Sequence, residues 1–443
     1  MQREPRGFGT FIFLWLTQSV SVFGDFLTIF GLNLWLTQHV YQDAAQRPQL
    51  GLALAALNLA FVLPNIVLAP IAGVWVDRLD RRRVMLVAAA LSAAVSLILA
   101  GLLVTNQLSV PLAVGMAGLL ACLGVFHEMA FDSSYVMVVP QAHLTRASGM
   151  MQTTDSLSRI LAPGLAALLV ALPALLGLKM PWASAGGGTG LLFVLDAASF
   201  CVAALALVWL RIPSPPREEE DEARPRGMGG ELREALAFLR ARPLLLMLLG
   251  TFALLNICIF PLALFETLLL KVNLLPDARA HGLSFPAALA LMTAAAGFGG
   301  VASGLLTSTW GGLKRNRIYG VLLPVMGLGV AEALLGLTSS LFLSVALFAV
   351  IGACAPFINA HSRTIWQLQV PPAMQGRVFA LRRVIAQSSG PLSLAVVGWL
   401  SGRVNPASIA LFLGVGILLV GGAQLLNPWM RRIEDVRPAV AAD

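Results

Sequence analysis

Apolar residues in this chain gather in long runs that short polar segments separate. Each run is about 20 to 30 residues long and lacks the two-residue alternation of a barrel strand. In lipid, only helices and closed barrels satisfy every backbone polar group, so these runs predict membrane-spanning helices. Twelve spans are predicted, approximately residues 9–38, 50–76, 84–105, 109–139, 147–176, 190–210, 244–271, 285–311, 318–338, 340–369, 378–401 and 407–430.

The first run, from Phe8 to Val40, is too long for the core of a signal peptide and predicts a retained span. Basic residues mark every second junction after it. If the N-terminus lies in the cytoplasm, the cytoplasmic junctions contain most of the cations, in residues 78–83, 211–242 and 314–317. Because Lys and Arg are retained on the cytoplasmic face, we expect a multi-pass protein of the cell inner membrane with both termini in the cytoplasm.

The middle of the chain divides it into two halves. Residues 211–230 are rich in proline and charge and cannot bury a core. We therefore expect an N-terminal six-helix bundle over residues 1–211, a cytoplasmic linker over 212–242, a C-terminal six-helix bundle over 243–430 and a cytoplasmic tail over 431–443. Apolar residues at three- and four-residue spacing within 231–242 predict a helix, either at the membrane interface or as a lead-in to the seventh span.

The two halves share features at a common offset. Val139-Pro140 and Val370-Pro371 are about 230 positions apart, as are Pro163-Gly164 and Gly390-Pro391. A segment that partly matches residues 73–83 also follows the eighth span. These matches predict a duplicated architecture with an axis along the membrane normal.

Composition agrees with a membrane protein. The 443 residues are 58% hydrophobic and only 12% charged, and the mean hydropathy is +0.81, which excludes an ordinary water-soluble fold. The net charge of +8 is explained by membrane topology, so we expect the lipid bilayer and not nucleic acid as a partner. The four cysteines lie in separate apolar runs, which argues against a disulfide framework or a zinc site.

A short charged segment between the second and third spans carries the most specific motif. It reads Gly73-Val-Trp-Val-Asp77-Arg78-Leu-Asp80-Arg81-Arg82-Arg83. The pattern resembles the signature loop between helices 2 and 3 of the major facilitator superfamily, except that Asp80 stands where the superfamily usually has Gly. With Asp at this position, the chain resembles the branch of macrolide and enterobactin exporters. It also resembles that branch at residues 21–25, 131–140, 195–200 and 371–378.

The resemblance implies an all-α membrane fold of twelve helices in two pseudo-symmetric bundles. It also implies a proton-coupled antiporter that moves a drug, macrolide or siderophore-like molecule out of the cytoplasm by alternating access. Protons and a small-molecule substrate are then the partners, the proton gradient is the energy source, and no cofactor or metal is expected. We expect the protein to act as a monomer.

Charged residues inside the spans are the first candidates for function. An ionised side chain at the bilayer centre costs about 2.5 to 3.5 kcal/mol, so each must be paired, hydrated or neutral. Asp25 lies near the middle of the first span, a helix that lines the cavity in the family resembled. We expect either that it couples proton movement to transport or that it caps a helix break at Gly24. Its counterpart in the seventh span is the neutral Asn256.

Other intramembrane charges have more than one interpretation. Asp155 and Arg159 are four residues apart on one helical face, which predicts an ion pair or, less readily, a substrate contact. Glu128, which follows His127, is expected either to carry a proton or to pair with Arg363 or Arg159 near the inner gate. Arg363 itself is expected to lock that gate, or else to meet an anionic group of the substrate.

Three further acids lie toward the outer half of the membrane. Glu266 in the seventh span is expected to face the cavity. Glu332 is expected to be peripheral, because the ninth span is peripheral in the family resembled. Asp196 is expected to be a helix-end residue that interfacial water reaches.

Two groups of residues predict mechanical roles. A gating latch is expected between the motif and the eleventh span, because the N-terminus of a helix favours an anion such as Asp77. Its members are Gly73, Asp77, Arg78, Arg81, Gly376 and Arg377. Hinges are expected at Pro163-Gly164 and Gly390-Pro391, where proline interrupts the hydrogen-bond ladder and glycine lets helices approach.

Alternative functions remain open on the sequence. A lysophospholipid or divalent-metal carrier of the same fold is the second choice, although no His, Cys or carboxylate cluster has metal-ligand spacing. A non-transporting sensor or scaffold is the third, and it would need neither the latch nor the intramembrane acids. An enzyme is not expected, since the sequence has no phosphate-binding loop or nucleophile elbow.

Overall fold

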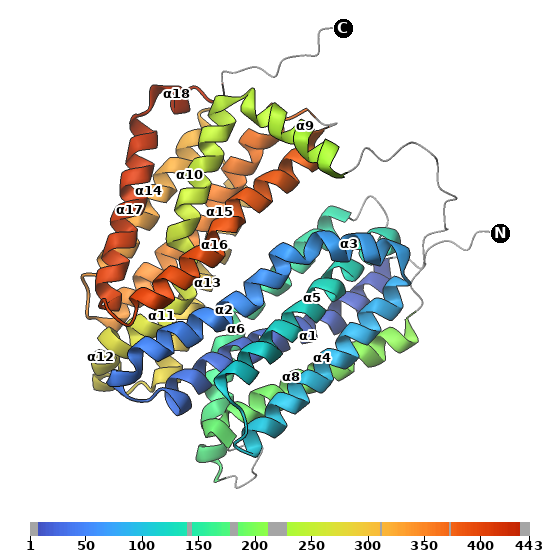
Figure 1. Cartoon of the computed structure of the whole chain (residues 1–443), viewed down its shortest axis with the longest axis vertical. Helices are drawn as coiled ribbons and strands as arrows, with labels where there is room; N and C mark the ends of the chain where they lie inside the picture. The colour runs from blue at the N-terminus through green and yellow to red at the C-terminus, as the bar shows by residue number, and fades with distance from the viewer. Residues whose placement is uncertain are drawn as a thin grey trace, which may run out of the picture. The chain divides into compact units, whose positions relative to one another are not determined.

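A computed structural model describes residues 8–139, 144–177, 185–210, 228–310, 312–371 and 374–434. Within these residues every regular element is a helix. The chain forms two compact units (Figure 1). The first contains Met1–Arg217 with Gly282–Ala294, and the second contains Glu218–His281 with Ala295–Asp443.

The first unit is built from long helices. They are α1 (Phe8–Trp35, extended by a π-helical turn, Leu36–Val40), α2 (Arg47–Val67), α3 (Ala69–Arg78), α4 (Arg81–Val104), α5 (Val110–Val138), α6 (Leu144–Leu175) and α8 (Thr189–Trp209). The remaining helices are α9 (Met228–Arg240), α10 (Pro243–Ile259), α11 (Leu262–Leu269), α12 (Leu275–Ala280), α13 (Phe285–Trp310), α14 (Arg317–Leu335), α15 (Leu341–Gln369), α16 (Gln375–Leu400), α17 (Pro406–Leu426) and α18 (Pro428–Arg431).

The predicted spans coincide with these helices. Among the described residues, ten helices are long and apolar enough to cross a membrane, and two shorter apolar helical segments, Leu157–Pro173 and Val384–Leu400, lie within α6 and α16. The all-α membrane fold is therefore confirmed, whereas the count of twelve spans stays a prediction. The helix predicted in the linker is α9.

Two predicted spans are broken, contrary to expectation. The second divides into α2 and α3 at Leu68, and the seventh divides into α10 and α11 at Phe260 and Pro261. Each break has a proline, Pro70 or Pro261, beside it, and proline has no N–H to continue an α-helical ladder. Hydropathy alone indicates one uninterrupted run at each place.

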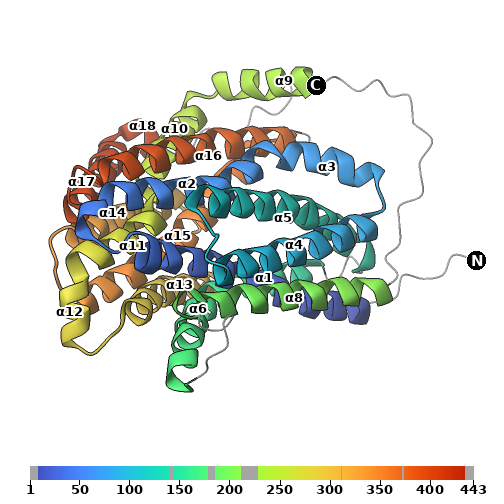
Figure 2. The same cartoon turned by 60° about the horizontal axis from the view of Figure 1, so that its bottom comes forward.

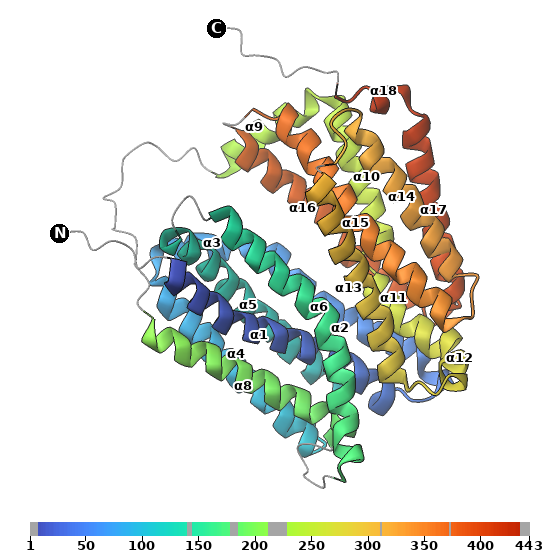
Figure 3. The same ribbon diagram turned by 180° about the vertical axis from the view of Figure 1, so that it is seen from behind.

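In the first unit, α8 lies between two neighbours. It packs against α4 on one side and α1 on the other, and α1 in turn contacts α6 (Figure 3). α5 packs against α2 and α4. A buried cluster of Leu14, Val76, Met85, Ala130 and Leu207 joins five helices at one end of this unit.

In the second unit, α14 packs between α15 and α17, and α9 lies across α10 and α16 (Figure 2). Glycines bring two more of its helices into backbone contact. A Cβ built on Gly299 of α13 would overlap the Ala349 carbonyl of α15, and one on Gly352 of α15 would overlap the Ala296 carbonyl of α13. The absence of side chains at Gly299 and Gly352 therefore allows the backbones of these two helices to approach closely.

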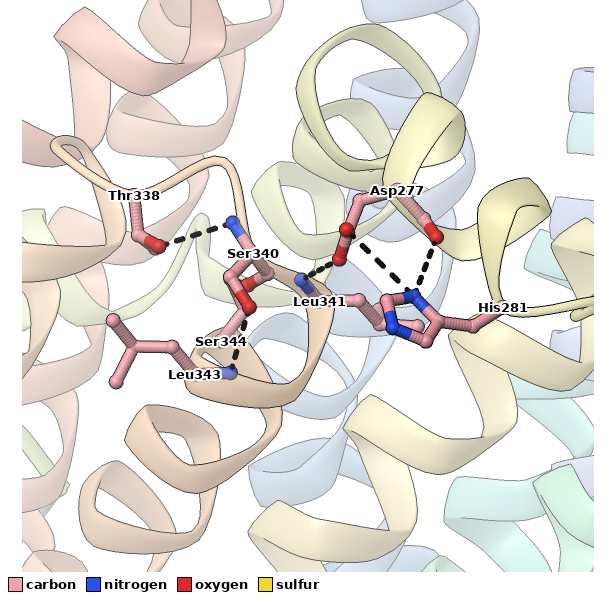
Figure 4. A network of polar contacts seen from close by, with 7 residues as sticks. All are labelled: Asp277, His281, Thr338, Ser340, Leu341, Leu343 and Ser344. Carbon is pink, nitrogen blue, oxygen red and sulfur yellow. Dashed lines mark hydrogen bonds and ion pairs between the residues drawn. The ribbon is translucent and has the colours of Figure 1, made fainter.

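A polar network fixes the start of α15 (Figure 4). Asp277 of α12 accepts a hydrogen bond from the Leu341 backbone N–H at 2.7 Å, and its other carboxylate oxygen lies 3.7 Å from His281 Nδ1. The Ser340 hydroxyl caps the same turn by accepting from Leu343 N–H at 3.5 Å. The carboxylate thus ties α12 to the positive end of α15.

We expect Asp277→Ala to lower the free energy of unfolding by about 1 kcal/mol, because a helix N-terminus loses a charged cap. The measurement is the thermal unfolding midpoint of the purified protein in detergent. Asp43→Ala, in the exposed segment before α2, is the matched control and should leave the midpoint unchanged. Equal midpoints for the two variants would contradict the capping role.

Candidate functional site

The first unit contains a cavity of about 390 Å³. Helices α1, α2, α4, α5, α6 and α8 all contribute to its wall. The aromatic residues Trp15, Phe61, Phe131 and Phe200 line it together with apolar side chains. Three carboxylates also line it, and none of its described lining residues is Lys or Arg; the carboxylates are Asp25, Glu128 and Asp132. The described wall is thus apolar and aromatic with three carboxyl groups.

Asp25 lies in this wall, as its expected role in coupling requires. The alternative role, a cap at a break next to Gly24, is wrong because α1 runs unbroken from Phe8 to Trp35. Gly24 serves another purpose. A Cβ there would overlap Asp196 Oδ1 and Ser199 Oγ of α8, so glycine is what lets α8 approach α1 at this level.

The environment of Asp196 differs from the prediction. The sequence predicts a helix end within reach of interfacial water, but the exposed fraction of Asp196 is 0% and the residue lies inside α8. Its Oδ2 accepts hydrogen bonds from Thr28 Oγ1 of α1 and Ser96 Oγ of α4, both at 2.7 Å. Position along the sequence indicates depth in the membrane but not the side of the helix. Thr28 and Ser96 were missed, although each is a polar residue within an apolar run.

Glu128 and Asp132 are four residues apart on α5, and both face the cavity. His127 also lines it, and its Nε2 is buried without a hydrogen-bond partner among the described residues. Glu128 and His127 are candidates on the sequence alone, whereas Asp132 enters there only as part of a motif. Helical spacing places it on the same face as Glu128 and could have identified it.

Arg159 and Asp155 lie on α6, next to the cavity residue Thr154. Arg159 is exposed, and its guanidinium carbon lies 5.1 Å from the centroid of the Phe26 ring, a cation–π contact with the residue that follows Asp25. The Asp155 side chain is outside the described part of the structure, so the predicted ion pair stays a prediction.

The second unit places its candidates differently. The Asn256 amide of α10 donates a hydrogen bond to the Ala386 carbonyl of α16 at 2.6 Å, so the counterpart of Asp25 connects two helices. Glu266 and Glu332 are both buried, with exposed fractions of 8% and 1%. The expectation that the span of Glu332 is peripheral to the cavity stays a prediction. Whether Glu266 faces a cavity stays a prediction.

Arg363 is exposed on α15. A second arginine, Arg382 of α16, is not among the residues that the sequence singles out. Its guanidinium donates to Ser362 Oγ at 3.1 Å and lies over the Trp366 ring at 5.2 Å. Arg382 follows the motif at residues 371–378 by one helical turn, a spacing that could have drawn attention to it.

The latch residues are only partly described. Gly73, Asp77 and Arg78 lie in α3, and Gly376 and Arg377 lie in α16, but their side chains are outside the described part, so the latch stays a prediction.

The motif does fix two helix ends. Asp80 caps α4 by accepting from the Arg83 N–H at 3.2 Å. Arg82 donates to the last carbonyls of α8, Leu207 at 2.7 Å and Val208 at 2.6 Å. A cation at the C-terminal end of a helix is favourable, so this arginine stabilises α8 where it leaves the bundle.

The two expected hinge sites lie inside continuous helices, Pro163 in α6 and Pro391 in α16. They differ in their packing. A Cβ on Gly390 would overlap the ring of Phe260, so this glycine brings α16 close to the end of α10. A Cβ on Gly164 would meet no described atom within 4 Å. Hinge motion at either site stays a prediction.

Comparisons with known proteins agree with the motif. A family model described as Major Facilitator Superfamily matches residues 14–394. Macrolide efflux protein A of Streptococcus pyogenes is 23% identical over 397 residues, which cover 89% of this chain and 90% of that protein. The enterobactin exporter EntS of Escherichia coli O139:H28 is 28% identical over 379 residues, covering 84% and 82%. The resemblance to this exporter branch is confirmed.

The fold has a solved counterpart. The crystal structure of a mutant of the nucleoside transporter NupG matches with a TM-score of 0.70 and 12% identity, over 93% of this chain and 98% of that one. Among the described residues, no group of three or more His, Cys, Asp or Glu side chains could hold a metal ion. The chain is a multi-pass membrane transporter, and its first unit provides an acidic cavity of a size suited to a small molecule.

We expect Gly24→Ala to destabilise the first unit by about 1 to 3 kcal/mol, because an added methyl group must displace Asp196 or Ser199 from a packed interface. Thermal unfolding in detergent measures the effect. The control is Gly101→Ala on the exposed face of α4, where the methyl group meets nothing within 4 Å and should be neutral or slightly stabilising. A normal midpoint for Gly24→Ala would show that this contact is not tight.

Proposed function

We propose that this chain, which belongs to the Major Facilitator Superfamily, is a proton-coupled exporter of amphiphilic small molecules that carry a positive charge. The observation that carries the proposal is the cavity in the first unit, where aromatic rings and three carboxylates meet without a cationic side chain among the described lining residues. Aromatic faces attract organic cations, and the carboxylates supply the opposite charge. The macrolide and enterobactin exporters among its relatives support the direction of transport.

Asp25 is the proposed coupling residue. A carboxyl group away from bulk water can exist in a neutral, protonated form, and a bound cation would favour its ionised form. Proton and substrate then compete for the same group. The proton gradient supplies the energy, since one charge moving through 100 mV releases about 2.3 kcal/mol.

The charge of the cavity distinguishes among the substrates expected from the sequence. An anionic siderophore would meet a like charge on ionised Asp25, whereas a protonated amine would meet an opposite one, in a wall to which Glu128 and Asp132 add two further carboxyl groups. We therefore favour a cationic drug or macrolide-like compound over a siderophore.

The remaining expectations from the sequence complete the proposal. The protein would act as a monomer in the inner membrane with both termini in the cytoplasm. A latch of Asp77, Arg78 and Arg81 with the start of α16 would close the cytoplasmic side in one of the two transport states.

We expect Asp25→Asn to abolish proton-driven export from proteoliposomes while substrate still binds, because an amide cannot release a proton. Flux of a fluorescent amphiphilic amine after an imposed pH gradient is the measurement. Asp43→Asn, exposed and outside the cavity, is the control. Full gradient-driven flux in Asp25→Asn would remove Asp25 from the coupling step, and no flux in the unaltered protein would refute the exporter function itself.

We expect the cavity to bind an amphiphilic amine at least about tenfold more tightly than its neutral N-acetyl derivative, since 1.4 kcal/mol of electrostatic attraction gives a factor of ten. Titration calorimetry or fluorescence quenching gives the two Kd values. The double variant Glu128→Gln, Asp132→Asn should reduce the difference. Equal affinities in the unaltered protein would contradict selection by charge.

A further inference from the structure

Another carboxyl group, Asp196, lies outside the described cavity lining but against Gly24, the neighbour of Asp25. Asp196 is fully buried, and Thr28 and Ser96 donate to the same oxygen, Oδ2. Two donors on one oxygen favour an ionised carboxylate. Three helices, α1, α4 and α8, therefore converge on a charge that is not part of the described cavity lining.

The other oxygen of this group, Oδ1, is buried and has no hydrogen-bond donor among the described residues. It lies against Gly24, the residue before Asp25. The nearby Ser199 hydroxyl is already used, because it donates to the backbone carbonyl of Asp196 at 2.6 Å. A buried acceptor without a donor is unfavourable, so an O–H or N–H donor that binds this oxygen in one state of the protein would stabilise that state.

The two helices that donate hydrogen bonds to Asp196, α1 and α4, carry few charged groups that could act as the donor to Oδ1. Asp25 is the one charged residue of α1, and it directly follows Gly24, against which Asp196 Oδ1 lies. The charges of α4 are residues 81–83 in its first turn, where Arg82 binds the far end of α8. The nearest charged group of α1 and α4 is therefore Asp25.

The charged groups of the other neighbouring helices are engaged elsewhere or face the cavity. On α6, Arg159 lies over the Phe26 ring, and the side chains of Arg146 and Asp155 are outside the described part. On α5, the titratable residues 127, 128 and 132 line the cavity, from which Asp196 is absent. Asp25 alone among these described groups combines a place in the cavity wall with a position next to Gly24, which Asp196 Oδ1 faces.

We propose that Asp25 and Asp196 form a two-carboxyl site that holds one proton, with the protonated Asp25 donating its O–H to Asp196 Oδ1. The inference rests on the proposed function and adds Asp196 as the positioning residue that keeps Asp25 protonated. When a cation enters the cavity, the O–H bond of Asp25 breaks and its proton passes to cavity water. The pair then carries two negative charges beside one positive charge, so the net charge of the site is the same before and after the exchange.

The constant net charge gives the arrangement its physical advantage. Two ionised carboxylates close together in a low-dielectric interior repel each other, and a shared proton removes that repulsion while the cavity is empty. The cation replaces the proton when the cavity is filled. Proton and cation are thereby made mutually exclusive.

The test is the pH dependence of tetraphenylphosphonium binding, because the charge of this cation does not change with pH. In the unaltered protein its Kd rises on acidification, since the proton competes. In Asp196→Asn the ratio of the acidic to the alkaline Kd should fall by about tenfold, which corresponds to one pH unit of lost proton affinity. In Asp25→Asn the dependence should weaken to the part that Glu128 and Asp132, which also line the cavity, contribute.

Ser96→Ala is a second variant in case Asp196→Asn does not fold. It removes one of the two donors that hold Asp196 ionised, so the pair should retain its proton more strongly and the same ratio should rise. Ser134→Ala is the matched control, because Ser134 is equally buried in the first unit but donates within its own helix, to Ala130 at 2.6 Å. This control should leave the ratio unchanged.

The outcomes separate the two proposals. If folded Asp196→Asn and Ser96→Ala both keep the ratio of the unaltered protein, Asp196 has only a structural role and the two-carboxyl site is refuted. That result would leave Asp25-dependent export intact. If the unaltered protein neither binds nor exports tetraphenylphosphonium, the proposed function fails first. A changed ratio in Asp196→Asn with a normal ratio in Ser134→Ala supports the two-carboxyl site.

Discussion

The burial of one carboxyl group, Asp196, governs the architecture of the first unit. A charge in an apolar interior is tolerated only if hydrogen bonds replace its hydration, and here Thr28 and Ser96 provide them. Removing either donor would leave a buried carboxyl oxygen less satisfied, so the two bonds make the packing of α1 and α4 against α8 specific. Asp25 lies on the same helix as Thr28 and lines the cavity.

Much of the fold is accessible from the sequence because the bilayer imposes a simple rule on helix length. The apolar runs predict the spans, and the charged motif at Asp77 to Arg83 indicates the family. Errors arise where rotation about a helix axis matters. Asp196 is predicted within the correct helix but with the wrong surroundings, because hydropathy does not tell which side of a span meets its neighbours. Hydropathy also does not predict the two broken spans, each of which has a single proline beside the break.

The two units have different side chains with different contacts at corresponding positions. Asp25 of α1 faces a cavity, whereas its counterpart Asn256 is engaged with the backbone of α16. The second unit carries two candidate arginines, Arg363 and Arg382, on α15 and α16. A duplicated fold has thus become chemically asymmetric, with the titratable carboxylates of the described cavity confined to the first unit. Sequence symmetry alone does not reveal this division, because it compares positions and not side-chain contacts.

The close approach of α13 and α15 at Gly299 and Gly352 has a consequence for how these helices can evolve and move. Backbone already touches backbone there, so any larger residue at either position must force the two helices apart. Neither a lipid tail nor water can enter such an interface, and one helix cannot slide past the other without a steric collision. At this crossing α13 and α15 are therefore constrained to move together.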